Sequence, residues 1–468
     1  MAEVTAFSAE VLSRLPLAQA TLELARFVHQ GDFLAELFAR HHADSYECLI
    51  TFPHFLDLVR DALLNRHGSL AAALDHADER DQLVASRQAY YGKLRRLPLE
   101  LSTAYLRQSS ARLRELTGPC VRPLPPSLDK FNIRIIDGKK LKRVAKRLLA
   151  TRGSAGKLFG GKLLVSWDPR VELVDAMAAD PDGEVNECRL VPALLGQFPD
   201  GTEEGPWLFV ADRQFGDKKQ PNRLLARGFH FLFRRNAKTH FHIEPRQPDH
   251  AEQRGVDGDG REVIQQWGWL GKGKGRVYVR QITLRRRGEE DIIVVTDLLD
   301  AEAYPAEDLL ELYRRRWGIE QVFGQITEVF GLARFIGSSP EATVFQAAFC
   351  LLLYNLIGIV KGGVARAVGC PTEEVSSQKL FESIHEELLS LCRLVTTDEI
   401  ESLLPRSDRA EILRARLQGL LAGCWKERYR KSRETKPRAK RDRPRRSGAH
   451  TSVFRLQQKF AHKRSEKG

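Results

Sequence analysis

The sequence lacks closely spaced cysteines. Its 468 residues contain seven cysteines, an odd number, and no two of them are two to four positions apart. Zinc ribbons need close cysteine pairs and disulfide frameworks need an even set, so the pattern excludes both kinds of scaffold. We expect reduced thiols and a cytoplasmic protein. The cysteines are Cys48, Cys120, Cys188, Cys350, Cys370, Cys392 and Cys424.

A signal peptide and a long apolar span are also lacking. The first residues, MAEVTAFSAEVLSRL, include acidic side chains and no unbroken apolar core. The longest apolar run, residues 344–360, contains Gln346, Asn355 and Gly358, and it is shorter than the ~20 residues of a usual span. We therefore expect no membrane partner, and we expect this run to form a helix at the centre of a soluble domain.

Motifs for ATP, zinc and calcium are missing too. The loop GKGKG at residues 271–275 does not have the spacing of a phosphate-binding P-loop. His240 and His242 could share a strand face, but no matching Cys or Asp pair stands nearby to complete a zinc site. The DGDG segment at residues 257–260 is too short for a calcium loop and predicts a hairpin turn.

Positive charge is present, but only at one end. Residues 425–468 contain 17 Lys or Arg and 4 Asp or Glu, which accounts for the whole net charge of +13. Such a tail is typical of an arm that binds a polyanion without base specificity, and a disordered solubilising extension is the alternative.

Periodicity divides the chain into five parts. Residues 1–126 show helical spacing and end in a Pro-rich linker, and no helix-turn-helix is clear among them. Residues 127–244 change to short apolar strands, 245–300 lack helical period, and 301–424 return to helices before the basic tail, 425–468. The fold class is therefore α/β, with a β-strand-rich insertion.

Two carboxylates follow apolar strands. Asp137 ends the run Ile133–Ile136, and Asp212 ends the run Trp207–Ala211. Aspartates in such places often cap a loop, so each alone would be weak. A third carboxylate, Glu320, follows on a predicted helix.

That helix carries the spacing Y-x2-R-x3-E. At about 100° per residue, Tyr313, Arg316 and Glu320 fall within roughly 60° of arc. The alternative is a solvated basic face, since Arg314 and Arg315 adjoin. Three carboxylates can hold two hard cations, Mg²⁺ or alternatively Mn²⁺, which activate an oxygen nucleophile on a phosphodiester and stabilise the leaving oxygen.

This set resembles the DDE transposases of bacterial insertion sequences, in particular the IS-four group, over about residues 45–395. The segment RRRWGIE at residues 314–320 is its most specific part. The resemblance implies a ribonuclease H-like core interrupted by the insertion. It implies that Asp137, Asp212 and Glu320 are catalytic metal ligands, and that Tyr313 and Arg316 hold the DNA end.

The resembled group has a lysine seven residues after the glutamate, where this chain has Thr327. The side chain at this position would meet DNA phosphate, to which a hydroxyl brings no charge. Thr327 could instead pack inside. Lys139 and Lys140 follow Asp137 and could touch the DNA backbone, or form a plain surface turn.

The insertion offers further candidates for contact with DNA. Trp267 and Trp269 lie beside the basic loop that carries Lys272 and Lys274. In related transposases an aromatic residue of this insertion can stack on a flipped base. The alternative is that the pair packs a small β subdomain.

The sequence therefore predicts a transposase that cuts the ends of an insertion sequence and joins the 3′-hydroxyl to target DNA. Its partners would be double-stranded DNA and a second copy in a synaptic homodimer, in the bacterial cytoplasm at the nucleoid. A metal-dependent nuclease that does not rejoin, or a non-catalytic DNA-binding regulator of transposition, are the alternatives.

Overall fold

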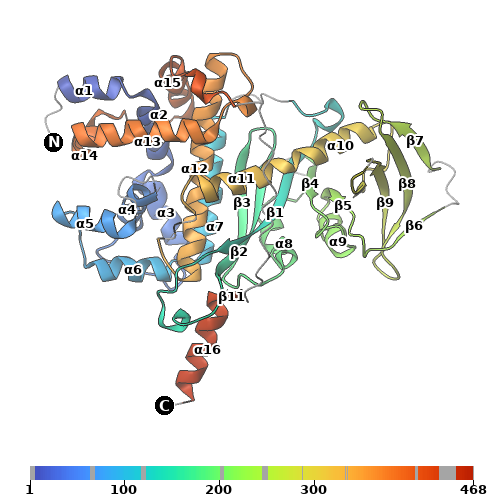
Figure 1. The fold of residues 1–468 in the computed structure, drawn as a ribbon, viewed down its shortest axis with the longest axis horizontal. Coiled ribbons are helices and arrows are strands. Elements are labelled where there is room, and N and C mark those ends of the chain that lie inside the picture. Colours follow the sequence, from blue (N-terminus) through green and yellow to red (C-terminus); the bar gives the residue numbers. More distant parts are fainter. Residues whose placement is uncertain are drawn as a thin grey trace.

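The computed structural model describes residues 6–63, 69–117, 123–200, 205–244, 251–286, 288–332, 334, 336–405, 409–431 and 450–466. A long mixed sheet runs through the molecule, helices from both ends of the chain gather on one side, and the strand-rich segment forms the opposite end (Figure 1). The fold is α/β, as predicted.

The centre of the sheet has the strand order β3-β2-β1-β4-β5. Strand β2 runs antiparallel to β1 and β3, whereas β4 and β5 run parallel to β1. This arrangement is compatible with a ribonuclease H-like transposase domain. The strands are β1 (Asn132–Lys142), β2 (Leu158–Asp168), β3 (Leu173–Asp180), β4 (Trp207–Ala211) and β5 (His230–Arg234).

The strand-rich segment after β5 continues the same sheet. Strand β10 pairs antiparallel with β5, and β9, β8 and β6 follow outward, with β7 also paired to β8. The strands are β6 (Phe241–Ile243), β7 (Gln253–Val256), β8 (Glu262–Leu270), β9 (Val277–Leu284) and β10 (Ile292–Thr296).

Helices from the two ends of the chain share one apolar core with a face of the sheet. From the first part come α2 (Pro16–Val28), α3 (Gly31–His41), α4 (Phe52–Leu63), α5 (Leu70–Glu79), α6 (Arg87–Arg96) and α7 (Leu99–Arg114). From the later part come α12 (Pro340–Ala367), α13 (Ser377–Leu394) and α15 (Ala410–Leu421). Helices α1 (Ala6–Ser13) and α14 (Thr397–Leu403) form a separate small cluster with the end of α13.

Helix α12 is the predicted central helix. It begins at Pro340, directly after Ser339, whose side chain caps the helix by accepting a hydrogen bond from the Ala342 N–H. The helix is long and apolar enough to cross a membrane, yet 94% of its most apolar window is buried inside the protein. It contacts α2, α6, α7, α13 and α15 as well as β2 and β3, so it is a core helix.

The alternation of side chains along β1 separates the two faces of the sheet. Ile133 and Ile135 join the core around α12, whereas Ile136 joins a second core, under α8 (Val191–Leu195) and α9 (Lys219–Leu225). Because successive strand residues alternate, Asp137 and Lys139 belong to the α12 face.

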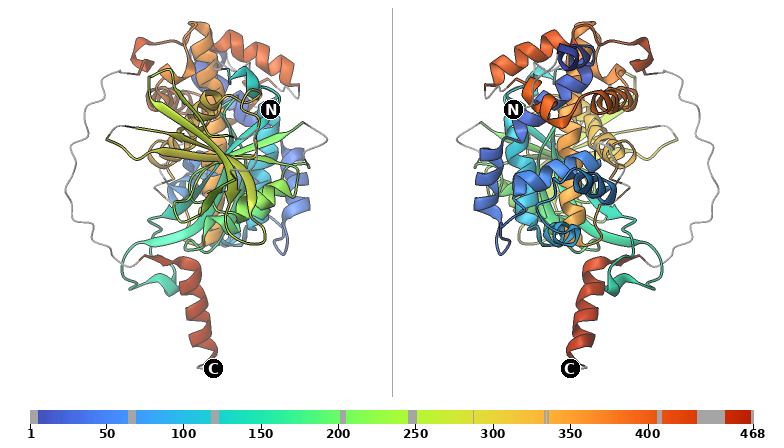
Figure 2. Two further views of the ribbon diagram at one scale, coloured as in Figure 1. Left: turned by 90° about the vertical axis from the view of Figure 1, so that its right-hand side faces the viewer. Right: turned by 90° about the vertical axis from the view of Figure 1, so that its left-hand side faces the viewer.

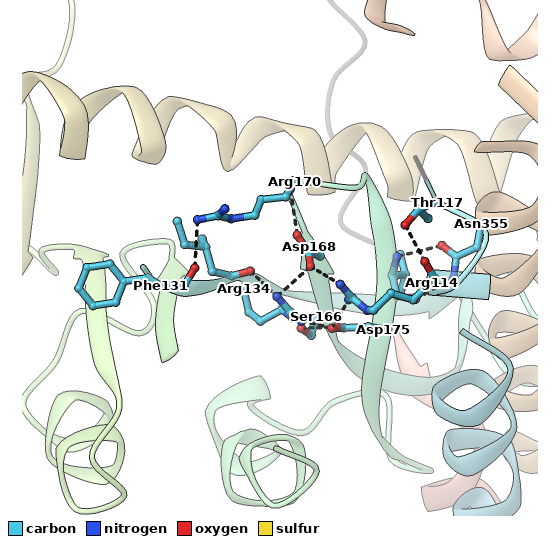
Figure 3. A network of polar contacts seen from close by, with 11 residues as sticks. Arg114, Thr117, Phe131, Arg134, Ser166, Asp168, Arg170, Asp175 and Asn355 are labelled. Atoms are coloured by element: carbon cyan, nitrogen blue, oxygen red, sulfur yellow. Dashed lines mark hydrogen bonds and ion pairs between the residues drawn. The ribbon is translucent and has the colours of Figure 1, made fainter. Parts of the chain in front are cut away.

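A buried ion network fixes the start of β1 to its neighbours (Figure 3). Arg134 pairs with Asp168 of β2 and Asp175 of β3, and Arg114 of α7 reaches the same two carboxylates. Burial opposes ionisation of Asp168, but the guanidinium groups of Arg134 and Arg114 outweigh it and hold its pKa below the ordinary value. The network joins α7 to three strands.

The predicted basic tail is partly described. Residues 432–449, 467 and 468 lie outside the described residues. Thr451–Ser452 form β11, which pairs with the edge of β2, and α16 (Val453–Ser465) projects away from the body (Figure 2). Arg455 anchors this helix through ion pairs with Asp182 and Glu184. Residues 451–465 are therefore an attached strand and helix.

Candidate active site

Strand register brings Asp137 and Asp212 to neighbouring positions. Ile135 pairs with Val210 across the parallel strands β1 and β4, and each aspartate stands two residues further on. Neighbouring strands are ~4.8 Å apart, and the alternation of residues along the two strands puts both positions on the α12 face. The sequence prediction placed both at strand ends. Asp212 does follow β4 directly, but Asp137 lies inside β1, at the point where β4 stops and β1 continues on β2 alone.

The Asp137 carboxylate is largely buried. Its side chain is 16% exposed, and it accepts a 2.8 Å hydrogen bond from the Gly138 N–H. Burial raises its pKa to about 7; the nearby charges of Asp212 and Glu187 add to the rise, while the Gly138 N–H and Arg316 oppose it. An acid with this pKa gains or loses a proton near neutral pH, and shifts of this kind are concentrated at functional sites.

Glu187 is a neighbour of Asp137 that the sequence analysis missed. It is 5% exposed, forms an ion pair with Lys162 of β2, and lies so close to Gly138 that a Cβ there would overlap its carboxylate. Gly138 is thus required by packing. No spacing in the sequence links residues 50 positions apart, so this contact could be found only in the fold.

The predicted helix with Tyr313, Arg316 and Glu320 is divided in two. Helix α10 (Ala306–Arg315) and α11 (Trp317–Glu328) meet at Arg316, which keeps helical dihedral angles. The hydrogen bonds there span three residues, from Arg316 N–H to Tyr313 and from Ile319 N–H to Arg316, so the turn is tightened. The two helices run nearly end to end (Figure 1), and α10 contacts β5 while α11 contacts β1.

Arg316 links the predicted residues. Its Nη2 lies 3.0 Å from Glu320 Oε1, its Nη1 lies 3.9 Å from Asp137 Oδ2, and its guanidinium is 5.8 Å from the centre of the Tyr313 ring. The Arg316 side chain is 14% exposed. One guanidinium thus contacts side chains from β1, α10 and α11.

The three consecutive arginines do not form a solvated basic face. Arg314 pairs with Asp257 of the insertion at 3.2 Å. Arg315 pairs with Glu311 and donates to the Pro123 carbonyl, each at 2.6–2.7 Å. Arg314 and Arg315 are therefore held by other parts of the fold, and of the three arginines only Arg316 contacts Asp137 and Glu320.

Tyr313 is nearly covered, at 7% exposed, and burial raises its pKa. The charge of Arg234, like those of Arg316 and Asp212, acts on this hydroxyl. Arg234 ends β5, beside Asp212, because Ala211 pairs with Phe233. Sequence analysis missed Arg234, although it ends an apolar strand on the same face as Leu232, the pattern that revealed Asp212.

Thr327 lies half-buried near the end of α11, and its hydroxyl donates a 2.7 Å hydrogen bond to the Phe323 carbonyl. The Lys139 ammonium donates a long bond of 3.4 Å to the same oxygen and lies 5.2 Å from the centre of the Phe323 ring. Lys139 is therefore not part of a plain surface turn.

The two tryptophans of the insertion differ in how far they are exposed to solvent. Trp267 is 1% exposed and its indole N–H donates to the Leu299 carbonyl, so its prediction as a base-stacking residue is wrong for this conformation: the ring is core. Trp269 is partly exposed, but the guanidinium of Arg276 covers its ring at 4.0 Å and Tyr278 meets it edge-on.

The loop with Lys272 and Lys274 is held by its backbone. Both carbonyls accept hydrogen bonds from the Lys218 ammonium, while the two lysine side chains are exposed. Glycines with positive φ at Gly271 and Gly273 allow this turn. The charges of the loop are thus directed to the surface.

The carboxylates fit a hard cation, although Arg316 now neutralises them. Within the described residues, no three His, Cys, Asp or Glu side chains are grouped closely enough to hold a metal ion as they stand. Asp137 and Glu320 are bridged instead by Arg316. An all-oxygen set of carboxylates suits Mg²⁺ or Mn²⁺ and not zinc, so the residues fit such an ion once Arg316 turns away.

Comparison with known proteins agrees with this geometry. No curated protein sequence matches the chain. Residues 129–356 match the family model described as the transposase DDE domain, a range that begins just before β1 and ends within α12. Residues 129–356, just under half of the chain, are therefore similar to the transposase DDE domain.

Proposed function

We propose that this protein is an insertion-sequence transposase, of the IS-four group, that cuts DNA at the element ends and joins the 3′-hydroxyl to target DNA. The observation that carries the proposal is the alignment of Asp137 and Asp212 on adjacent parallel strands, with Glu320 tied to Asp137 through Arg316. The family match supports the transposase activity in general.

Asp137, Asp212 and Glu320 are the proposed ligands of Mg²⁺, with Mn²⁺ as an alternative. When bound, such ions activate an oxygen nucleophile and stabilise the leaving oxygen. Asp137 must then give up the proton that it keeps up to a pH of about 7 in the free protein. Glu320 is more exposed than Asp137, at 36% against 16%, so it closes the site from the solvent side.

Arg316 and Tyr313 are the proposed contacts to the DNA end. A guanidinium binds a phosphate through two parallel hydrogen bonds, and Arg316 already has both Nη atoms directed at oxygen atoms. Tyr313 lies under the guanidinium and orients it. Thr327, Lys272 and Lys274 remain proposed DNA contacts, and Trp269 keeps this role only if Arg276 moves from its ring.

The reaction consists of two displacements at phosphorus. Water first attacks the phosphorus at the element end, the P–O3′ bond breaks, and a 3′-hydroxyl and a 5′-phosphate result. The 3′-hydroxyl oxygen then attacks a target phosphorus while the target P–O3′ bond breaks, so the number of phosphodiester bonds is kept. A hairpin intermediate is compatible with the resemblance. Because two element ends must be held together, the proposed active form is a homodimer on DNA. Its proposed location is the cytoplasm.

The helices of residues 1–126 are the proposed reader of the element ends, and residues 127–244 and 301–424 are the proposed catalytic core around the insertion, 245–300. The basic segment 425–468 would add contacts to phosphate that do not depend on sequence.

The test uses a plasmid that carries the DNA flanking the coding sequence, with its terminal inverted repeats. We expect cleavage and strand transfer by the native chain with Mg²⁺. Asp137→Asn, Asp212→Asn and Glu320→Gln should abolish both and still bind the ends. Asp259→Asn, in an exposed turn of the insertion, is the matched control that should remain active. Cleavage without joined products would indicate a nuclease, and end binding without cleavage a regulator.

A further inference from the structure

The side chain of Lys139 ends close to Thr327, the position at which the resembled group has its lysine. Lys139 stands two residues after Asp137 in β1, on the same face of the sheet. Its ammonium and the Thr327 hydroxyl donate hydrogen bonds to one oxygen, the Phe323 carbonyl, at 3.4 and 2.7 Å. A side chain from the sheet and one from the helix therefore end beside each other.

Lys139 forms no direct ion pair. No carboxylate lies within 4 Å of its ammonium in the part of the chain that the structure describes, in contrast to Arg316 and Lys162. An ammonium has three donors, and the single long bond to Phe323 uses one of them. The ammonium itself lies over the Phe323 ring, 5.2 Å from its centre, and the charges of Asp137 and Glu328 act on it without forming a direct ion pair.

We propose that Lys139 is a phosphate-binding residue of the active site, supplying from β1 the positive charge that the resembled group supplies from the helix position of Thr327. A lysine binds phosphate as a compact point charge and does not require the planar geometry of arginine. The inference rests on the proposed function, because the phosphate is that of the DNA end held beside Asp137. It assigns Thr327 a supporting role in place of the missing lysine.

The experiment compares two neighbouring lysines. Lys139→Met keeps a long unbranched side chain and removes the charge, Lys139→Arg keeps the charge, and Lys139→Gln is a second neutral variant should the first fold poorly. Lys140→Met is the matched control, since Lys140 points to the opposite face and its ammonium lies 5.3 Å from the Phe159 ring. Binding to a duplex carrying the terminal inverted repeat is measured against salt, without divalent metal.

We expect Lys139→Met to bind the end about 10-fold or more weakly, the usual loss for one charged hydrogen bond, and to lower the log–log salt slope by ~0.9. Lys140→Met and Lys139→Arg should keep the native slope. Thr327→Lys in the Lys139→Met background should restore both affinity and slope, because it returns a charge to the same place.

An unchanged slope in a folded Lys139→Met or Lys139→Gln protein would overturn the inference, as would equal losses in Lys140→Met. These outcomes are separate from failure of the proposed function. A native chain that binds the ends and never cuts them would reject the transposase, whereas a native chain that cuts and a Lys139→Met protein that binds normally would reject only the role of Lys139.

Discussion

Gly318 of α11 packs directly on the indole ring of Trp167 in β2, with no room between them for a methyl group. This contact sets the distance between α11 and the sheet. Gly318 is two residues from both Arg316 and Glu320, so the same contact positions these two side chains. It gives a physical reason for the glycine in the segment RRRWGIE, which sequence analysis could note only as a pattern.

We therefore expect Gly318→Ala to lift α11 from the sheet. Overpacking of this kind costs about 1–3 kcal/mol, and Glu320 would move with the helix, so cleavage should fall far more than end binding. Gly324→Ala is the control on the same helix, because nothing lies within 4 Å of a Cβ there and alanine favours helix. Melting temperature and plasmid cleavage would check both variants. Equal activity of the two would contradict the argument.

The acid at Asp137 predicts a pH dependence of stability. Its pKa is about 7 in the folded chain and 3.8 when unperturbed, so the folded state binds the proton more tightly. The cost of ionising it is absent below pH 4, grows between pH 4 and 7, and is complete above pH 7. Asp137→Asn removes this cost, and should stabilise the metal-free protein at pH 8 by at most about 4 kcal/mol.

The measurement is denaturant unfolding of the native and Asp137→Asn proteins at pH 5 and pH 8 with a chelator present. The difference in unfolding free energy between the two proteins should be larger at pH 8 than at pH 5. Asp259→Asn, whose side chain is 67% exposed, should show no such widening. An equal difference in unfolding free energy at pH 5 and pH 8 would mean that Asp137 is ionised at both pH values.

Divalent cations should stabilise the native chain through the same carboxylates. An ion at 100 times its dissociation constant adds about 2.7 kcal/mol to the stability of the folded state. We expect Mg²⁺ or Mn²⁺ to raise the melting temperature at pH 8, with a smaller rise at pH 6, where the proton on Asp137 competes. Asp137→Asn and Asp212→Asn should lose most of the shift. An equal shift in all three proteins would place the ion elsewhere.

The basic tail is best tested with two truncations. The first deletion should begin after Lys431, because Tyr429 is fully buried and its carbonyl accepts the Ser376 N–H. A chain ending at residue 431 should have a lower salt slope for random DNA, by ~0.9 for each DNA phosphate that the tail neutralises in the native chain. A chain ending at residue 449 keeps the basic segment and lacks α16, so the comparison separates the two. Slopes equal to that of the native chain would indicate a solubilising role.

The parts of the site that the sequence predicted are those with a local signal. Asp137 and Asp212 follow apolar runs, and the spacing of Tyr313, Arg316 and Glu320 survives the break between α10 and α11 because Arg316 keeps helical angles. The strand register that aligns the two aspartates is a long-range property. It follows from pairing across 75 residues of chain, which no local pattern encodes.

The parts that sequence analysis missed depend on which surfaces the fold covers. Trp267 is buried because the segment around Leu299, 32 residues later, covers it and accepts its N–H. Glu187 reaches Asp137 across 50 residues of chain, which no spacing indicates, whereas Arg234 ends an apolar strand and so had a local signal like that of Asp212. Lys139 was ambiguous because its partner, the Phe323 carbonyl, belongs to a helix 184 residues later.

The contact of Arg316 with both Asp137 and Glu320 has a thermodynamic consequence. Under the proposed function, the Arg316 guanidinium would have to leave Asp137 and Glu320 when a metal ion binds, and a DNA phosphate is the ligand that could receive it. Metal and DNA binding would then be linked, and by reciprocity each would raise the affinity for the other by the same factor. Arg316 would keep the affinity of the free protein for cations low, so that the complete site would assemble on the DNA end.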